Sequence, residues 1–179
     1  GALGYGGVPN EEDIVLDVGL KLQTLLESHG AEVVMTRETD TDVSLSERCS
    51  IANSASADIF VSVHCNSYSD PAAHGTETYW YTYGSSQSET LSVHVQDKLL
   101  EYLQRHDRGV KQADYYVLHY TDMPASLAEL AFVSNSEEWS LLSQDYYRQD
   151  AAQALFEAVC LYYGVSPPDD QDTLPPTVS

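Results

Sequence analysis

A histidine near the end of an apolar stretch is the first candidate for a functional residue in this sequence. The stretch from Asp58 to Asn66 is rich in β-branched and aromatic residues and ends in His64 and Cys65. Its apolar residues fall on both parities, which is typical of a strand covered on both faces. Because ligands of open α/β sheets bind at the carboxyl ends of such strands, the sequence places His64 at a candidate site.

Two glutamates could meet this histidine. Glu129 lies inside an apolar run, where a carboxylate loses hydration free energy unless it is paired, bound to a metal or acting as an acid or base. It could also be solvated, or paired with Arg37 or Arg48. Glu11 opens a helical pattern after a glycine-rich loop, where an acidic residue is favourable for electrostatic reasons alone. No single one of these signals is specific, but with His64 they make up a zinc site with a second glutamate as general base.

Composition limits the class of protein. The 179 residues, 42% hydrophobic and 20% charged, suit one globular domain. The formal net charge is −20, so the chain lacks the basic surface that binding to nucleic acid requires. This charge favours either a soluble, secreted type of surface or a protein attracted to cationic partners. No long apolar run predicts a membrane span or a signal peptide, and because the chain begins with Gly1 we expect that an upstream segment has been removed. Three cysteines without a CxxC pattern exclude a fully paired disulfide framework.

Periodicity predicts alternating strands and helices, and therefore a single α/β domain with a mainly parallel or mixed sheet flanked by helices on both faces. The Ser44-x-x-Glu47 and Ser134-x-x-Glu137 patterns are predicted to be capping boxes, and Arg108-Gly109 to be a turn into a polar link. The domain is expected over 1–164, with 165–179 as a Pro/Asp-rich tail or linker. The expected helices cover 11–29, 45–55, 91–102, a short stretch after 134, and 147–163; the expected strands cover 31–36, 58–64, 76–83, 115–119 and 126–132.

Several segments, taken in order along the chain, carry a resemblance to one family. The segments are Met35-Thr36-Arg37-Glu38-Thr39-Asp40, Leu45-Ser46-Glu47-Arg48, Ala52-Asn53, Ala57 to Ser67 with Phe60-Val61-Ser62-Val63-His64, Gly75-Thr76-Glu77-Thr78-Tyr79, Asp107-Arg108-Gly109-Val110-Lys111, and Met123 to Asn135 with Pro124-Ala125-Ser126-Leu127-Ala128-Glu129. They look like the zinc-dependent N-acetylmuramoyl-L-alanine amidases of bacterial cell-wall turnover, of the type 3 catalytic domain, and the resemblance runs in the family's own order from Gly1 to about Gly164.

The resemblance implies a peptidoglycan hydrolase that cleaves the amide between N-acetylmuramic acid and the L-alanine of the stem peptide. It implies one Zn²⁺ ion, with Glu11 (or, less well matched, its neighbour Glu12) and His64 as ligands and Glu129 as the general base that activates the water. Asn66 is similar to a residue that lines the family's cleft, and the position of His119 is that of a substrate contact more than a ligand. It also implies an extracytoplasmic place of action, in the cell wall or periplasm or as a secreted protein.

One departure from the family concerns a further zinc histidine, which lies in a loop after the family's first strand. Gly1-Ala2 looks like the pair that follows this loop, so the first strand and its histidine are expected upstream of this chain. With two ligands where zinc hydrolases keep three, the chain as written is expected to bind metal poorly and to be inactive. Between Tyr83 and Lys111 there is room for one helix only, so no inhibitory plug is expected, and targeting would depend on a wall-binding domain outside this chain.

Other classes of function stay open at this point. The chain could be a peptidoglycan-binding pseudoenzyme, although a pure binder has no need of the carboxylate of Glu129 in an apolar run. It could be another zinc peptidase of similar fold with a different substrate. A cysteine hydrolase that uses Cys65 with His64 or His119 is disfavoured, because adjacent strand residues point to opposite faces. The aromatic strand with Tyr79, Trp80 and Tyr81 could line a glycan groove or simply pack in the sheet.

Overall fold

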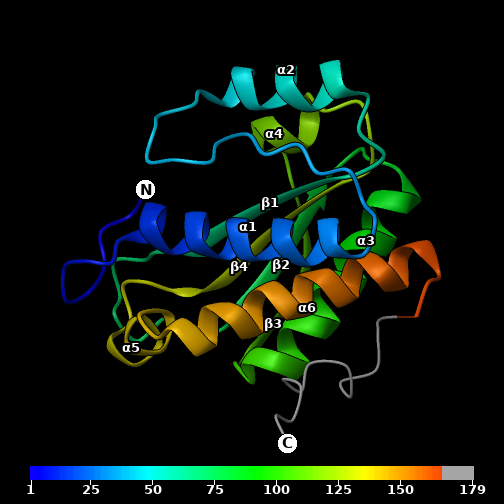
Figure 1. Cartoon of the computed structure of the whole chain (residues 1–179). Helices are drawn as coiled ribbons and strands as arrows, with labels where there is room; N and C mark the ends of the chain where they lie inside the picture. The colour runs from blue at the N-terminus through cyan, green and yellow to red at the C-terminus, as the bar shows by residue number, and fades with distance from the viewer. Residues whose placement is uncertain (167–179) are drawn as a thin grey trace, which may run out of the picture.

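A four-stranded mixed sheet positions the candidate residues in the computed structural model, which describes residues 1–166 (Figure 1). The strand order is β1-β4-β2-β3. β1 runs parallel to β4 and β2 runs parallel to β3, whereas β2 and β4 are antiparallel. The bounds of the strands are β1 Phe60–Asn66, β2 Thr76–Tyr81, β3 Asp107–Ala113 and β4 Ala125–Phe132.

Six helices surround this sheet in the described part of the chain. The three long helices pack together against one face, where the main apolar core includes Val18, Val95 and Leu155. In Figure 1, α1 and α6 lie side by side across the sheet. The bounds of the helices are α1 Glu11–Ser28, α2 Leu45–Ala55, α3 Ser86–Leu103, α4 Tyr116–His119, α5 Ser136–Leu142 and α6 Asp145–Tyr163.

The opposite face is covered over only part of its area. α2 and α4 lie together there, apart from the layer of α1 and α6 (Figure 1). A second apolar cluster joins Cys49 of α2 and Val117 of α4 to Phe60, Ala125 and Leu127 of the sheet. The remaining part of this face is not covered by α2 and α4 and carries polar side chains. The candidate active site described below lies there.

The expected fold class is confirmed, and so are the helices over 11–29, 45–55, 91–102 and 147–163. The capping box at Ser44 and Glu47 forms as predicted. The box predicted at Ser134 is wrong, because α5 is capped by Asn135, whose Oδ1 accepts from the amides of Glu137 and Glu138. Of the expected tail, residues 167–179 lie outside the described residues.

Two predictions about strands fail for local reasons. The predicted strand 115–119 is the short helix α4, because the backbone amides of Leu118 and His119 bond the carbonyl of Tyr115 within the same segment instead of a neighbouring strand. The predicted turn at Arg108-Gly109 is part of strand β3. Gly109 has φ +85° and lies where the register with β2 shifts, so this strand contains a bulge.

The predicted strand 31–36 is also wrong, since these residues pair with no strand in the described chain. A groove of about 610 Å³ separates them from β1, and it is lined by apolar residues of α1, α2 and β1 such as Val15, Ile51 and Val61. Because a strand requires a hydrogen-bonded neighbour, an apolar sequence alone is insufficient here. Among residues 1–166, no helix is long and apolar enough to cross a membrane.

Candidate active site

Three polar residues form a row across the partly open face of the sheet. His64 of β1 pairs in register with Glu129 of β4, and Glu129 pairs in register with Glu77 of β2. Residues directly opposite each other on neighbouring strands point to the same face. Leu127, two positions before Glu129, and Phe60, four positions before His64, pack with α2 and α4 on that face. The row therefore continues the same face beyond the area covered by these helices.

The helix α1 brings Glu11 to His64. Glu11 Oε1 lies 2.8 Å from His64 Nδ1 and accepts from the Cys65 amide at 3.3 Å, while Oε2 accepts from the Ala2 amide at 2.7 Å. Burial raises the pKa of Glu11, but these hydrogen bonds and the charge of His64 outweigh burial, so the pKa lies below its ordinary value. Glu11 is thus ionised at neutral pH and is held by contacts that fix its position.

Glu129 lies in a very different environment. Its Oε2 is buried and has no hydrogen-bond partner among residues 1–166. Burial raises the pKa of Glu129 to about 7, His64 opposes this shift, and the carboxylates of Glu11 and Glu77 add to it. Neither Arg37 nor Arg48, the cations considered as partners from sequence, forms an ion pair with Glu129 in this part of the chain. A carboxyl group with a pKa near neutrality can both accept and donate a proton under physiological conditions.

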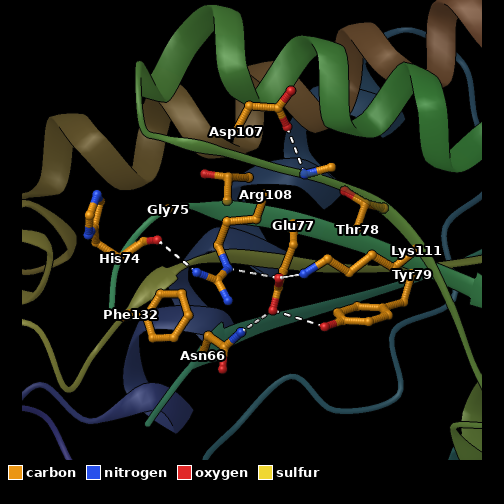
Figure 2. Close-up of polar contacts among 12 residues, drawn as sticks. Asn66, His74, Gly75, Glu77, Thr78, Tyr79, Asp107, Arg108, Lys111 and Phe132 are labelled. Carbon is orange, nitrogen blue, oxygen red and sulfur yellow. Dashed lines mark hydrogen bonds and ion pairs between the residues drawn. The ribbon is translucent and has the colours of Figure 1, made fainter. Parts of the chain in front are cut away.

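Glu77, the other carboxylate of the row, accepts hydrogen bonds from four side chains (Figure 2). Its side chain is 3% exposed, and its Oε1 accepts from Asn66 Nδ2 at 2.6 Å and from the Tyr79 hydroxyl at 2.9 Å. Its Oε2 accepts from Arg108 Nε at 2.8 Å and from Lys111 Nζ. Burial raises the pKa of Glu77, but the hydrogen bonds from Lys111, Arg108 and Tyr79 outweigh burial and lower it. Glu77 is therefore ionised at neutral pH, and it accepts hydrogen bonds from four side chains.

The bulge of β3 explains how two cations reach one carboxylate. Arg108 and Lys111 are three positions apart, so in a regular strand their side chains would point to opposite faces. The pairing with β2 passes from Thr76↔Asp107 to Thr78↔Val110, which places one additional residue on β3. Sequence reasoning missed Glu77, Arg108 and Lys111 as site residues, because it treated 108–109 as a turn and so did not put these side chains on one face.

The two other residues proposed from the resemblance lie at different distances from the row. Asn66 contacts the row through Glu77, so its amide helps to position that carboxylate. His119 lies in α4, where its ring stacks on Tyr81 and Tyr120 with centroids 4.5 and 4.3 Å away, and its Nδ1 lies 2.8 Å from Asp114 Oδ1. Tyr81 is four residues along β2 from Glu77, a separation of roughly 13 Å. The structure therefore does not bring His119 together with Glu11, His64 and Glu129.

The three cysteines do not offer a nucleophile. Cys49, Cys65 and Cys160 are buried and form no disulfide. Burial, and then the negative charges of Glu11, Glu129 and Glu138, raise the pKa of the Cys65 thiol well above its ordinary value. Since the thiolate is the reactive form, this environment argues against the cysteine-hydrolase alternative.

The side chains near His64 provide part of the ligand set that a zinc ion requires. Glu11 and His64 are a carboxylate and an imidazole in direct contact, which are donors that zinc accepts, and the unpartnered Oε2 of Glu129 lies on the strand beside them. Hydrolytic zinc sites use three protein ligands, and residues 1–166 contain no group of three or more His, Cys, Asp or Glu side chains placed to hold a metal. The described residues therefore bring together two donors of a kind that zinc accepts, and not three.

Comparison with known proteins identifies close relatives. Residues 1–160 match the model of the family described as N-acetylmuramoyl-L-alanine amidase. The chain is 40% identical over 164 residues to the N-acetylmuramoyl-L-alanine amidase LytC of Bacillus subtilis, covering 91% of this chain and 33% of LytC. It is also 40% identical over 164 residues to the protein YqiI of Bacillus subtilis, covering 91% of this chain and 78% of YqiI.

The fold agrees with solved structures of such enzymes. The catalytic domain of CwlV, an N-acetylmuramoyl-L-alanine amidase from Bacillus (Paenibacillus) polymyxa var. colistinus, superimposes with a TM-score of 0.87 at 30% sequence identity. The match covers 93% of this chain and 92% of the CwlV domain. The chain thus corresponds to nearly the whole of a catalytic domain, but to about a third of LytC.

Proposed function

This chain belongs to the family of N-acetylmuramoyl-L-alanine amidases, and from that premise we propose that it hydrolyses the amide between N-acetylmuramic acid and the L-alanine of the peptidoglycan stem peptide. The observation that carries the proposal is the row on the open face of the sheet. There Glu129, with an unpartnered buried oxygen and a pKa of about 7, lies beside the Glu11–His64 pair. Some relatives of this chain are named as cell wall amidases, so the proposed place of action is extracytoplasmic.

We further propose that Glu11 and His64 hold a Zn²⁺ ion. Both residues present the right donor chemistry, and Glu11 is ionised as a ligand must be. When bound, zinc would supply a Lewis acid that acidifies water and polarises a carbonyl oxygen. The contacts of Glu11 with the amides of Ala2 and Cys65 would keep this carboxylate in place, because they leave it few alternative orientations.

In this proposal Glu129 is the general base. Its Oε2 is free to accept a proton from the attacking water, because no group in the described chain occupies it. A pKa of about 7 means that the same carboxyl group can then donate the proton to the leaving amine of L-alanine. Burial, the main cause of the raised pKa, thus makes this residue suited to both halves of the reaction.

The proposal is tested on purified peptidoglycan with the full-length protein. We expect release of new L-alanine amino termini, and about one zinc per molecule by elemental analysis. Glu129→Gln should lower the rate at least about 100-fold while zinc content stays the same, because a general base contributes about 10²–10⁴-fold. The control is Glu101→Gln, an exposed glutamate that bonds Lys98 on α3, which should leave the rate unchanged.

Two alternatives correspond to other outcomes of this experiment. The described residues bring together two zinc donors and not three, which favours a peptidoglycan-binding pseudoenzyme as the second candidate. Binding of peptidoglycan with no new amino termini would support that reading. New amino termini of a residue other than L-alanine would indicate a different zinc peptidase. Absence of zinc together with an unchanged rate in Glu129→Gln would show that the site is assigned wrongly.

A further inference from the structure

The cluster around Glu77 contains more positive than negative charge. One carboxylate, Glu77, receives an arginine and a lysine, so the three groups carry a net charge of +1 (Figure 2). Asp107 is directed away from these three groups toward α3 (Figure 2), where its Oδ1 accepts from the amide of Gly109 and from Gln96, 2.8 Å away in each case. A chain with 8 Lys and Arg against 28 acidic residues places two of its cations here, beside the candidate base.

Both cations keep hydrogen-bond donors available. Arg108 uses Nε for Glu77 and Nη1 for the carbonyl of His74 at 3.3 Å, and its Nη2 has no partner in residues 1–166. Lys111 Nζ bonds Glu77 alone in the same part of the chain. An ammonium has three N–H donors, so two remain for a ligand. The side chains are 32% and 37% exposed, which leaves them accessible from solvent.

Aromatic rings and Glu77 together hold these donors in position. The guanidinium of Arg108 lies 4.9 Å from the centroid of the Phe132 ring, and Lys111 Nζ lies 5.8 Å from that of Tyr79. Glu77, directly opposite Glu129 on the neighbouring strand, anchors both. Positively charged donors fixed in this way lose little conformational entropy when an anion binds.

We propose that Arg108 and Lys111 form a subsite that binds a carboxylate on the peptide part of the substrate. The inference rests on the proposed amidase function and adds to it a determinant of substrate choice. The N-acetylated sugar rings of the substrate carry no charge, so a carboxylate near the scissile amide belongs to the peptide. Arg108 contributes a planar guanidinium suited to carboxylate and Lys111 contributes a compact charge. The two residues are substrate-binding groups and take no part in proton transfer.

The test compares two synthetic muramoyl peptides that differ only in one stem-peptide group, a free carboxylate or the corresponding carboxamide. Binding is measured by titration calorimetry in the Glu129→Gln protein, so that no turnover occurs. We expect the carboxylate peptide to bind about tenfold more tightly than the carboxamide, as charged hydrogen bonds of this kind would give. Adding Lys111→Met should abolish most of this preference, and so should Arg108→Met in a separate protein.

Lys98→Met is the matched control. It removes the same charge from α3, where Lys98 bonds Glu101 and Glu157, and should keep the tenfold preference. The proposal is overturned if both peptides bind equally well, or if Lys111→Met and Arg108→Met weaken both equally, which would indicate a structural role. Competition by inorganic phosphate with no preference between the peptides would also overturn it and would identify a general anion site.

The result is separable from the proposed function, because it measures binding without turnover. A preference for the carboxylate peptide in a protein that releases no L-alanine from peptidoglycan would support the subsite and remove the amidase proposal. Release of L-alanine without any preference would support the amidase and remove the subsite. In an active protein, Lys111→Met should raise KM for the carboxylate peptide about tenfold and leave kcat within about twofold. The reason is that the lost contact binds the substrate and the transition state equally well.

Discussion

At the scale of single residues, the site contrasts two carboxylates that lie opposite each other on neighbouring strands. Glu77 accepts from four side chains and has a lowered pKa, whereas Glu129 is buried with an unpartnered oxygen and has a pKa of about 7. The same functional group thus serves as an anchor at one position and as a candidate base at the other. Environment alone separates these roles.

Glu129 should make stability depend on pH in the metal-free protein. Its folded pKa of about 7 lies above the ordinary 4.5, so the folded state keeps a proton that the unfolded state has released between these values. The free energy of unfolding should therefore fall as pH rises from about 4.5 to about 7, by at most about 3.5 kcal/mol at about 1.4 kcal/mol per pKa unit. Urea unfolding at several pH values measures this slope.

The variant Glu129→Gln is the reference for that measurement. Since glutamine does not titrate, the stability of the variant relative to the natural protein should increase across the interval from about pH 5 to about pH 8. A difference that stays constant across the interval would show that Glu129 does not have a raised pKa in the folded state.

Glu77 should matter for stability through the cations it anchors. Glu77→Gln leaves Arg108 and Lys111 without their shared anion, and we expect a loss of about 1–3 kcal/mol, less than for a fully buried pair because both cations are partly exposed. Chemical denaturation measures the loss. Glu101→Gln, which breaks an exposed pair with Lys98, should change stability by less than about 0.5 kcal/mol. Equal small effects of both variants would contradict a central role for Glu77.

At the scale of elements, the bulge in β3 is what makes the cluster possible. Gly109 has φ +85°, and a β-carbon added there would have nothing within 4 Å, so only backbone strain opposes another residue. The extra residue allows side chains three positions apart to reach the same carboxylate. A regular strand of the same length would separate Arg108 from Lys111.

Gly109→Ala should therefore reduce both stability and peptide binding. We expect a loss of about 1–2 kcal/mol from backbone strain, and a smaller preference for the carboxylate peptide, because relief of the strain would alter the bulge. Gly30→Ala is the matched control. Gly30 follows α1 with φ +86° and also has open space, so its substitution should cost about the same stability without affecting binding. Calorimetry gives both quantities, and equal binding by the two variants would contradict the role of the bulge.

At the scale of the whole molecule, the net charge of −20 should oppose compact folding. We expect the urea midpoint to rise as sodium chloride increases from about 10 to about 150 mM, because the screening length falls from about 30 to about 8 Å. Sodium and potassium chloride should act alike if screening is the cause. A midpoint that falls with salt would show that ion pairs, such as those of Lys98 with Glu101 and Glu157, outweigh the repulsion.

The sequence alone determined the features that depend on local pattern. Helical periodicity and the Ser44 capping box were sufficient for the long helices, because such signals need no distant partner. The apolar strand ending near His64 and the isolated acidic residue in the last strand pointed to two members of the row. The resemblance of several segments to one family added the family, which the family match then confirmed.

Only the tertiary structure decided which side chains meet. The antiparallel placement of β2 beside β4 sets Glu77 opposite Glu129, and the bulge turns Arg108 and Lys111 toward Glu77. The strand order β1-β4-β2-β3 arises from contacts between residues far apart in the chain, so no local pattern encodes it. For the same reason residues 31–36 have an apolar sequence yet pair with no strand in the described chain, since pairing depends on a neighbour that the local sequence cannot supply.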